Sequence, residues 1–228
     1  MRALREKICF LSILFFVILG ACGCGQKSAP ETESEAVTAF TGSPERIEEA
    51  AKCVVKLEVF DESEKRIAVG SGFYAVGEGY LITSAHVVKH MAYAVVTEDD
   101  GQSFRIDGLI AVDDVADVAV LDLGEQVRDT FLPIGETLPL RGENVAVIGT
   151  TAGFINLVTL GNVSRIWESD ENNRILFTAP VSLGNSGGPV LNDRGEVIGV
   201  VMGTYDYAEN LNVAISMEAV WKLLKSEE

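Results

Sequence analysis

The sequence predicts an all-β protein made of antiparallel sheets that close into barrels or pack into a sandwich. Short apolar segments rich in β-branched residues recur from Cys53 to Ile215, and turns rich in Gly, Asn and Asp separate them. Apolar residues at helical spacing flank this region on both sides. The chain of 228 residues is 47% hydrophobic and 23% charged, which indicates a globular protein with room for one all-β domain or two small ones.

The expected strands share alternating or continuous apolar character and end at turn residues. They cover 54–60, 69–76, 80–83, 92–97, 104–112, 118–123, 144–149, 158–166, 174–179, 189–191, 197–203 and 211–215.

A short helix is expected before the first strand and another after the last. Ser43 is a good N-cap, Pro44 fits the first helical position, and Ile47 begins an apolar face. Residues 216–225 predict the closing helix, packed on the body with Trp221 in the core.

The N-terminus has the pattern of a secretory signal. Basic residues precede the apolar run 8–19, which is too short to span a bilayer but suits a signal peptide over residues 1–21. The sequence Leu19-Gly20-Ala21-Cys22 resembles the bacterial lipobox, which implies cleavage before Cys22 and its lipidation. Two alternatives stay open, namely an ordinary signal cut near Ala21 or an uncleaved anchor.

Residues 22–44 predict a lipid-anchored flexible linker, because they are polar and lack apolar periodicity. Multiple acyl chains on Cys22 give durable attachment to a lipid membrane. We therefore expect the protein in the cell envelope, anchored to a bacterial membrane and facing the periplasm or the exterior. The sequence does not choose between inner and outer membrane.

Charge and cysteine content narrow the classes of partner. A formal net charge of −16 repels nucleic-acid phosphates, so no nucleic-acid partner is expected. Cys53 is the one cysteine of the body and is expected to be buried without a disulfide partner. No metal-ligand cluster or phosphate-binding loop is visible, so no cofactor and no metal site are predicted.

A glycine-rich turn, Gly184-Asn185-Ser186-Gly187-Gly188-Pro189, lies between two apolar runs. Glycines allow backbone N–H groups to point into a shared space, where they can hold the oxygen of a carbonyl that a serine hydroxyl attacks. Ser186 is therefore a candidate nucleophile. The alternative is a simple Gly-rich hairpin turn.

A base and an orienting acid are available elsewhere in the chain. Of the two histidines, His86 follows a predicted strand and His90 is expected in solvent. Asp117 starts an apolar strand, where its side chain can be buried and aimed inward. The order His86, Asp117, Ser186 is one of several that serine-nucleophile triads use.

The contexts Thr83-Ser84-Ala85-His86, Ala116-Asp117-Val118-Ala119-Val120-Leu121 and the Ser186 turn resemble those of trypsin-like serine proteases of the HtrA (Deg) family. The segments Gly70-Ser71-Gly72-Phe73 and Leu160-Gly161-Asn162-Val163-Ser164 are similar to that family as well. The resemblance implies a peptidase domain over residues 45–228 made of two six-stranded antiparallel barrels, the first about 45–131 and the second about 132–228. The triad would lie in the cleft between them.

The resemblance also implies a mechanism and a specificity. Ser186 attacks, His86 acts as general base and acid, Asp117 orients His86, and the N–H groups of Gly184 and Ser186 form the oxyanion hole. A specificity pocket lined by Val181, Met202 and Thr204 holds no acidic residue, so cleavage after small or aliphatic residues is expected.

Two departures from the family pattern are expected. Asn185 stands where digestive relatives carry an aspartate that pairs with a new N-terminus, so zymogen-type activation is not expected. HtrA proteins usually carry PDZ domains after the peptidase body, whereas this sequence ends at Glu228, soon after the closing helix. Family trimers use segments near the protease N-terminus, which makes a homotrimer with a contact at Phe40 a further expectation.

The function predicted on these grounds is a serine endopeptidase that hydrolyses unfolded or misfolded envelope proteins through an acyl-enzyme. The alternative is a catalytically silent, membrane-anchored module that keeps the fold and holds peptides in the cleft.

Overall fold

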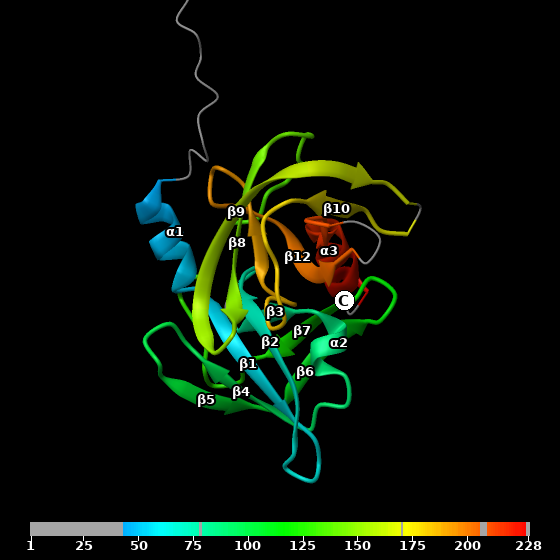
Figure 1. The fold of residues 1–228 in the computed structure, drawn as a ribbon. Coiled ribbons are helices and arrows are strands. Elements are labelled where there is room, and N and C mark those ends of the chain that lie inside the picture. The colour runs from blue at the N-terminus through cyan, green and yellow to red at the C-terminus, as the bar shows by residue number, and fades with distance from the viewer. Residues whose placement is uncertain (1–42, 78, 170, 206–208, 227–228) are drawn as a thin grey trace, which may run out of the picture. The chain divides into compact units, whose positions relative to one another are not determined.

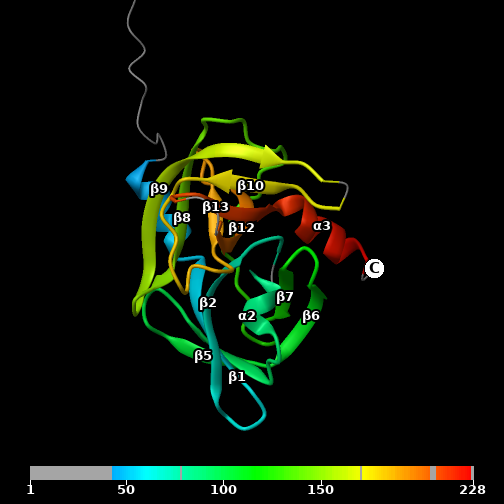
Figure 2. The same ribbon diagram turned by 45° about the vertical axis from the view of Figure 1, so that its right-hand side comes forward.

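The computed structural model describes residues 43–77, 79–169, 171–205 and 209–226 (Figures 1 and 2). All of them belong to one compact unit, residues 37–228. The predicted signal peptide, Cys22, Phe40 and nearly all of the predicted linker lie outside the described residues. Within the described ranges, no helix is long and apolar enough to cross a membrane.

The first half of the body is a seven-stranded antiparallel sheet with the order β5-β4-β1-β2-β3-β7-β6. Its strands are β1 Val54–Phe60, β2 Arg66–Tyr74, β3 Tyr80–Thr83, β4 Tyr93–Thr97, β5 Ser103–Ile106, β6 Gly108–Asp113 and β7 Val118–Asp122. Only Asp107 separates β5 from β6 in the chain, although these strands form opposite edges of the sheet. The sheet must therefore curl until its two edges meet at Asp107.

This bend replaces the single strand expected over 104–112. Ile106 pairs with Ala94 on β4, whereas Gly108 pairs with Asp122 on β7. A Cβ at Gly108 would come 2.6 Å from the Cβ of Asp122, so the close approach at the bend requires glycine. Counting β5 and β6 as one bent strand gives the six strands expected of the first barrel.

The second half is a closed barrel with the order β10-β13-β12-β11-β8-β9. Its strands are β8 Asn144–Thr151, β9 Phe154–Trp167, β10 Arg174–Phe177, β11 Pro189–Leu191, β12 Val197–Thr204 and β13 Asn212–Ser216. The long strand β9 closes it, because its first part pairs with β8 and its last part with β10. The predicted all-β class with two barrel-like halves is thus confirmed.

The core runs from one half into the other. The strands of the first sheet bury a continuous apolar cluster that also includes Ile148 of β8, Leu191 of β11 and Ile215 of β13. A smaller cluster fills the closed barrel around Phe177. Because the two halves share core residues, groups at their boundary are held by packing from both sides.

The terminal helices lie where the sequence placed them. Helix α1, Pro44–Ala51, begins at Ser43, whose side chain accepts a hydrogen bond from the Arg46 N–H at 3.3 Å. Helix α3, Met217–Lys225, buries Met217, Ala219, Val220 and Leu223. Trp221, which was expected in the core, is 40% exposed, because the buried face of α3 is centred on Val220 and the next residue of a helix is rotated away from it.

Candidate active site

Three segments that are distant in sequence carry the predicted triad. His86 lies on α2, Ala85–Val88, a single helical turn directly after β3. Asp117 immediately precedes β7, and Ser186 lies in the loop between β10 and β11. The sequence predicted the strands on both sides of these positions but not the helical turn that carries His86.

His86 and Asp117 are in direct contact. The imidazole Nδ1 lies 2.8 Å from Asp117 Oδ2 and 3.0 Å from Oδ1, and the backbone N–H of His86 donates to Oδ1 at 2.9 Å. Asp117 has a φ of +60°, a left-handed conformation that aspartate tolerates better than most residues. A carboxylate on Nδ1 keeps the proton there, which leaves Nε2 as the basic nitrogen.

Ser186 reaches the same site from the second half but points elsewhere. Its hydroxyl donates to the backbone carbonyl of Met202 on β12 at 3.1 Å. Within the described part of the chain, no hydrogen bond joins this hydroxyl to His86. Ser186 and His86 nevertheless line one groove of about 440 Å³. Transfer of the proton to His86 thus requires the Ser186 side chain to rotate away from Met202.

Three backbone carbonyls of the Ser186 loop accept hydrogen bonds from residues of β2 and β8. Gly184 C=O accepts from Ser71 Oγ at 2.7 Å, and Ser186 C=O accepts from the Ser71 N–H at 2.8 Å. Leu183 C=O accepts from Thr151 Oγ1 at 3.1 Å. In a trans peptide the N–H points opposite to the C=O, so this bond aims the Gly184 N–H away from Thr151.

Two backbone N–H groups of this loop have no hydrogen-bond acceptor among the described residues. Neither the Gly184 N–H nor the Ser186 N–H donates a hydrogen bond to any residue that the structure describes. Gly184 has a φ of +100°, and a Cβ there would come 2.5 Å from the Thr150 carbonyl oxygen, so glycine is required. These two N–H groups are available to an oxygen that carries negative charge.

Ser71 has a role that sequence reasoning did not assign. It is fully buried on β2, and its hydroxyl donates to Gly184 C=O while accepting from the Thr150 N–H at 2.8 Å. It therefore joins the first sheet, the nucleophile loop and β8 through one side chain. The segment Gly70-Ser71-Gly72-Phe73 resembles the corresponding segment of HtrA proteases, but its sequence gives no indication of the hydrogen bonds that Ser71 makes.

Asn185 stabilises the same loop from inside. It is 2% exposed, its side-chain oxygen accepts from the Ser182 N–H at 2.9 Å, and its own N–H donates to Ser182 C=O at 3.0 Å. The Asn185 side chain thus binds the loop itself.

The predicted specificity residues Val181, Met202 and Thr204 are not among the residues that line this groove. Met202 and Val181 are partly buried against the two core clusters, and Thr204 is exposed at the end of β12. Met202 is placed next to Ser186 by the hydroxyl–carbonyl bond.

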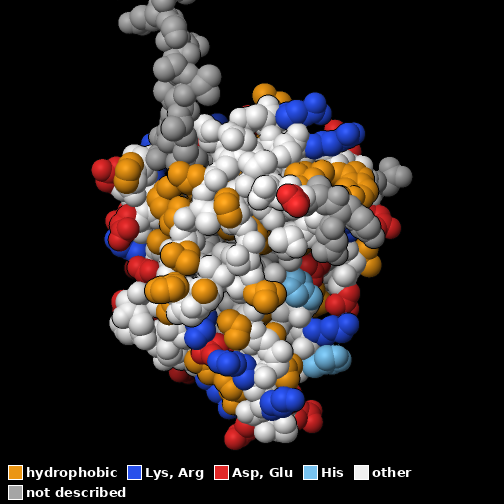
Figure 3. Space-filling view, viewed as in Figure 1, with side chains coloured by type: hydrophobic (Ala, Val, Ile, Leu, Met, Phe, Trp, Pro, Cys, Tyr) orange, Lys and Arg blue, Asp and Glu red, His pale blue; other side chains and the backbone are white. Residues whose placement is uncertain are grey.

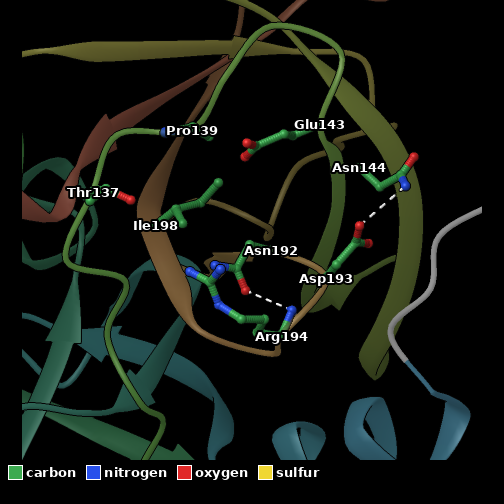
Figure 4. A pocket seen from close by; sticks show the side chains of 8 residues that line it. All are labelled: Thr137, Pro139, Glu143, Asn144, Asn192, Asp193, Arg194 and Ile198. Atoms are coloured by element: carbon green, nitrogen blue, oxygen red, sulfur yellow. Dashed lines mark hydrogen bonds between the residues drawn. The ribbon is translucent and has the colours of Figure 1, made fainter.

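A separate cavity of about 230 Å³ lies away from these residues, around the turn between β11 and β12 (Figure 4). Asn192 accepts from the Arg194 N–H at 2.9 Å, and Asn144 donates to Asp193 at 3.3 Å. These bonds stay within or beside the turn, and Asp193 Oδ1 has no hydrogen-bond partner among the described residues.

The predicted triad lies in a part of the chain that matches a known protein family. The family model of the trypsin-like peptidase domain matches residues 70–200, a span that contains His86, Asp117 and Ser186. The chain belongs to the trypsin-like peptidase family. A zebrafish (Danio rerio) relative of this peptidase, serine protease HTRA1B, is 30% identical over 225 residues, covering 92% of the chain and 46% of HTRA1B.

Two further proteins are similar over most of the trypsin-like domain. Anti-sigma-I factor RsgI9 of Acetivibrio thermocellus is 31% identical over 195 residues, covering 85% of the chain and 27% of that protein. The solved structure of the HtrA-type protease AlgW with a tripeptide matches with a TM-score of 0.70 at 23% identity, covering 79% of the chain and 62% of AlgW. The chain thus spans less than half the length of these two curated relatives, HTRA1B and RsgI9.

Proposed function

We propose that this trypsin-like peptidase is a serine endopeptidase of the HtrA kind. The observation that carries the proposal is the His86–Asp117 pair beside a serine loop with two N–H groups that the described residues leave without partners. Family membership and the HtrA relatives support the same activity.

The geometry supports a two-step reaction. After rotation from Met202, Ser186 Oγ attacks the scissile carbonyl carbon, and its proton passes to His86 Nε2. The carbonyl oxygen becomes an oxyanion between the N–H groups of Gly184 and Ser186. His86 then protonates the leaving amine as the C–N bond breaks. A water molecule, deprotonated by His86, hydrolyses the acyl-enzyme and regenerates Ser186.

A fluorophosphonate probe tests this function directly, because it labels a serine only where a base and an oxyanion site activate it. We expect labelling of the wild-type protein, none of Ser186→Ala, and strong reduction in His86→Ala. Cleavage of an unfolded protein such as reduced casein should show the same ranking.

The catalytically silent module remains the second candidate, and one observation favours it. The Ser186 hydroxyl is bonded to Met202 rather than to His86. A neutral hydrogen bond contributes about 0.5–1.5 kcal/mol, so rotation is accessible in an active enzyme. Absence of labelling both with and without unfolded protein would favour the module.

For substrates, we propose unfolded or misfolded proteins of the cell envelope, cleaved after small or aliphatic residues. Val181 and Met202 are apolar and Thr204 is small, and a pocket without a carboxylate has no partner for Lys or Arg. A peptide-library profile dominated by Arg at the cleaved position would contradict this specificity.

For location and assembly, we propose attachment to a bacterial membrane through acylated Cys22 and a homotrimeric state. The lipobox-like sequence before Cys22 supports the anchor. Hydrophobic side chains gather on one face near α1, β8 and β9, which supports burial against other copies (Figure 3). Its exposed members on β9 are Phe154, Leu157, Val158 and Leu160. Palmitate labelling abolished by Cys22→Ala, and the mass in solution, test these two points.

A further inference from the structure

The groove that contains His86 and Ser186 continues across the first sheet to a group of charged residues. It starts at the nucleophile loop and ends at Lys56 and Glu58 on β1 and Arg66 on β2. Its walls also include Val69 of β2 and Leu183 of the nucleophile loop, which are 38% and 96% exposed. The groove thus combines exposed apolar side chains with a charged far end at Lys56, Glu58 and Arg66.

The direction of a bound substrate in this groove can be derived from the proposed function, on which this inference rests. The groove is lined by His86, which protonates the leaving amine, and by Gly184 and Ser186. Its lining does not include Val181, Met202 or Thr204, which are assigned to the residue on the acyl side. The segment after the scissile bond is therefore the part of the substrate that enters the groove.

The far end of the groove carries one excess positive charge. Lys56 Nζ lies 2.8 Å from Glu58 Oε2, and Arg66 pairs with the other oxygen, Oε1. The hydrogen bond from Lys56, together with the weaker effect of the one from Arg66, lowers the pKa of Glu58, so this carboxyl is ionised at neutral pH. Two cations therefore share a single carboxylate, and none of the other acidic residues that the structure describes lines the groove.

This sign is unusual for the molecule, since the whole chain carries a formal net charge of −16. Figure 3 shows basic side chains, with acidic ones beside them, toward the lower part of the face, where the β1–β2 hairpin lies in Figure 1. The side chain of Arg66 is 56% exposed, and its guanidinium carries more N–H donors than one carboxylate oxygen occupies. A second carboxylate can bind there without displacing Glu58.

We propose that this groove is a subsite for the leaving segment of the substrate, in which an apolar residue contacts Val69 and Leu183 and a carboxylate further along binds at Lys56 and Arg66. The carboxylate comes from an Asp or Glu side chain or from the free C-terminus of a short substrate. Such a subsite selects substrates by the residues on the leaving side of the cleaved bond, independently of the residue before it.

Matched peptides with a quenched fluorophore test the proposal. They share one cleavage site and differ by Glu, Gln or Lys at each of the first four positions after it, with amidated C-termini. At one or two positions we expect kcat/KM to be about two- to fivefold higher for Glu than for Gln, the range of an exposed ion pair, and lower for Lys than for Gln. Higher salt should reduce the Glu/Gln ratio. Free-acid versions of the Gln peptides, shortened in steps, separate a terminal carboxylate from a side chain.

Three variants and one control locate the effect. Lys56→Gln and Arg66→Gln should each bring the Glu/Gln ratio toward one, and Glu58→Gln should raise it because the competing carboxylate is gone. Lys52→Gln, a change in a lysine paired with Glu49 outside the groove, should leave the ratio unchanged. The Gln peptide measures intact catalysis in every variant.

Equal rates for Glu, Gln and Lys at all four positions in an enzyme that cleaves the Gln peptide would overturn the subsite and leave the proposed function standing. Absence of cleavage of every peptide, together with absence of fluorophosphonate labelling, would overturn the proposed function itself. If a variant fails to fold, the wild-type peptide series and its salt dependence decide.

Discussion

Replacing Ser71 with alanine is expected to damage both stability and catalysis. The substitution removes one oxygen from a fully buried position and leaves no large cavity. It deprives two groups of their partners, the Gly184 carbonyl and the Thr150 N–H, which are bonded at 2.7 and 2.8 Å. A buried group left unpaired costs about 1–3 kcal/mol, so the loss of two partners in Ser71→Ala should lower the free energy of unfolding by roughly 2–6 kcal/mol.

Ser84→Ala is the matched control. Ser84 is equally buried and also bridges the two halves, but its hydroxyl makes one bond, to Val201 C=O at 2.9 Å. Val201 C=O also accepts from the Gly187 N–H at 2.8 Å and keeps that partner, so Ser84→Ala should lose only about 0.5–1.5 kcal/mol. Urea unfolding monitored by tryptophan fluorescence gives both values, and the slopes of the transitions should match that of the wild-type protein.

The variants Ser71→Ala and Ser84→Ala are also expected to differ in catalytic rate. Ser71 holds the carbonyl of Gly184, whose N–H is proposed for the oxyanion hole, whereas the Ser84 hydroxyl bonds to β12 instead. Removing one oxyanion donor typically costs about 10²–10³ in rate, which sets the upper limit for loosening it through Ser71. We expect kcat in Ser71→Ala to fall at least about tenfold below that of Ser84→Ala at temperatures where both are folded. Equal stability and equal kcat in the two variants would refute the role assigned to Ser71.

Three further outcomes are expected from the geometry. Thr151→Val removes the hydroxyl that donates a hydrogen bond to Leu183 C=O. Because one hydrogen bond contributes about 0.5–1.5 kcal/mol, kcat should fall about two- to tenfold, with little change in the urea midpoint. An unchanged kcat would contradict this. Gly187→Ala places a Cβ 2.2 Å from a backbone oxygen at a φ of +86° and should prevent stable folding. Its control is Gly195→Ala, where φ is +76° and the space around the Cβ is open, and which should lower the free energy of urea unfolding by only about 1 kcal/mol. Burial raises the pKa of the Cys53 thiol to about 11 from an ordinary value of 9.0, so the native protein should resist thiol reagents at pH 8. Because the unfolded thiol loses its proton first, wild-type stability relative to Cys53→Ala should fall as pH rises from 9 to 11; a constant difference would contradict the shift.

The local pattern of the sequence was sufficient for most elements. The apolar pattern predicted β1, Val54–Phe60, and β3, Tyr80–Thr83, with their observed bounds, because β1 alternates between buried and partly buried residues and β3 is a short run that is buried on both faces. Burial of Cys53, exposure of His90 and the Ser43 cap also depend on near neighbours and are confirmed. The triad order could be read from the sequence because each member has a recognisable local context.

Other features depend on contacts between distant segments. The break at Asp107 results from the closing of the sheet, and the exposure of Trp221 results from how α3 lies on the body. The apolar periodicity around Asp107 and Trp221 predicts neither feature, because the residues that they contact are far away in the chain. The charged end of the groove is of the same kind, because Lys56 and Arg66 meet only when β1 pairs with β2.

The sequence by itself determined the all-β class, the candidate nucleophile, base and acid, and the apolar, lipobox-like N-terminus, because propensity and periodicity are local properties. The tertiary structure alone decided that Asp117 contacts His86 through both carboxylate oxygens, that Ser186 rests on Met202, and that Ser71 supports the Gly184 peptide. These are distances across the boundary of two sheets, and packing from both sides sets them.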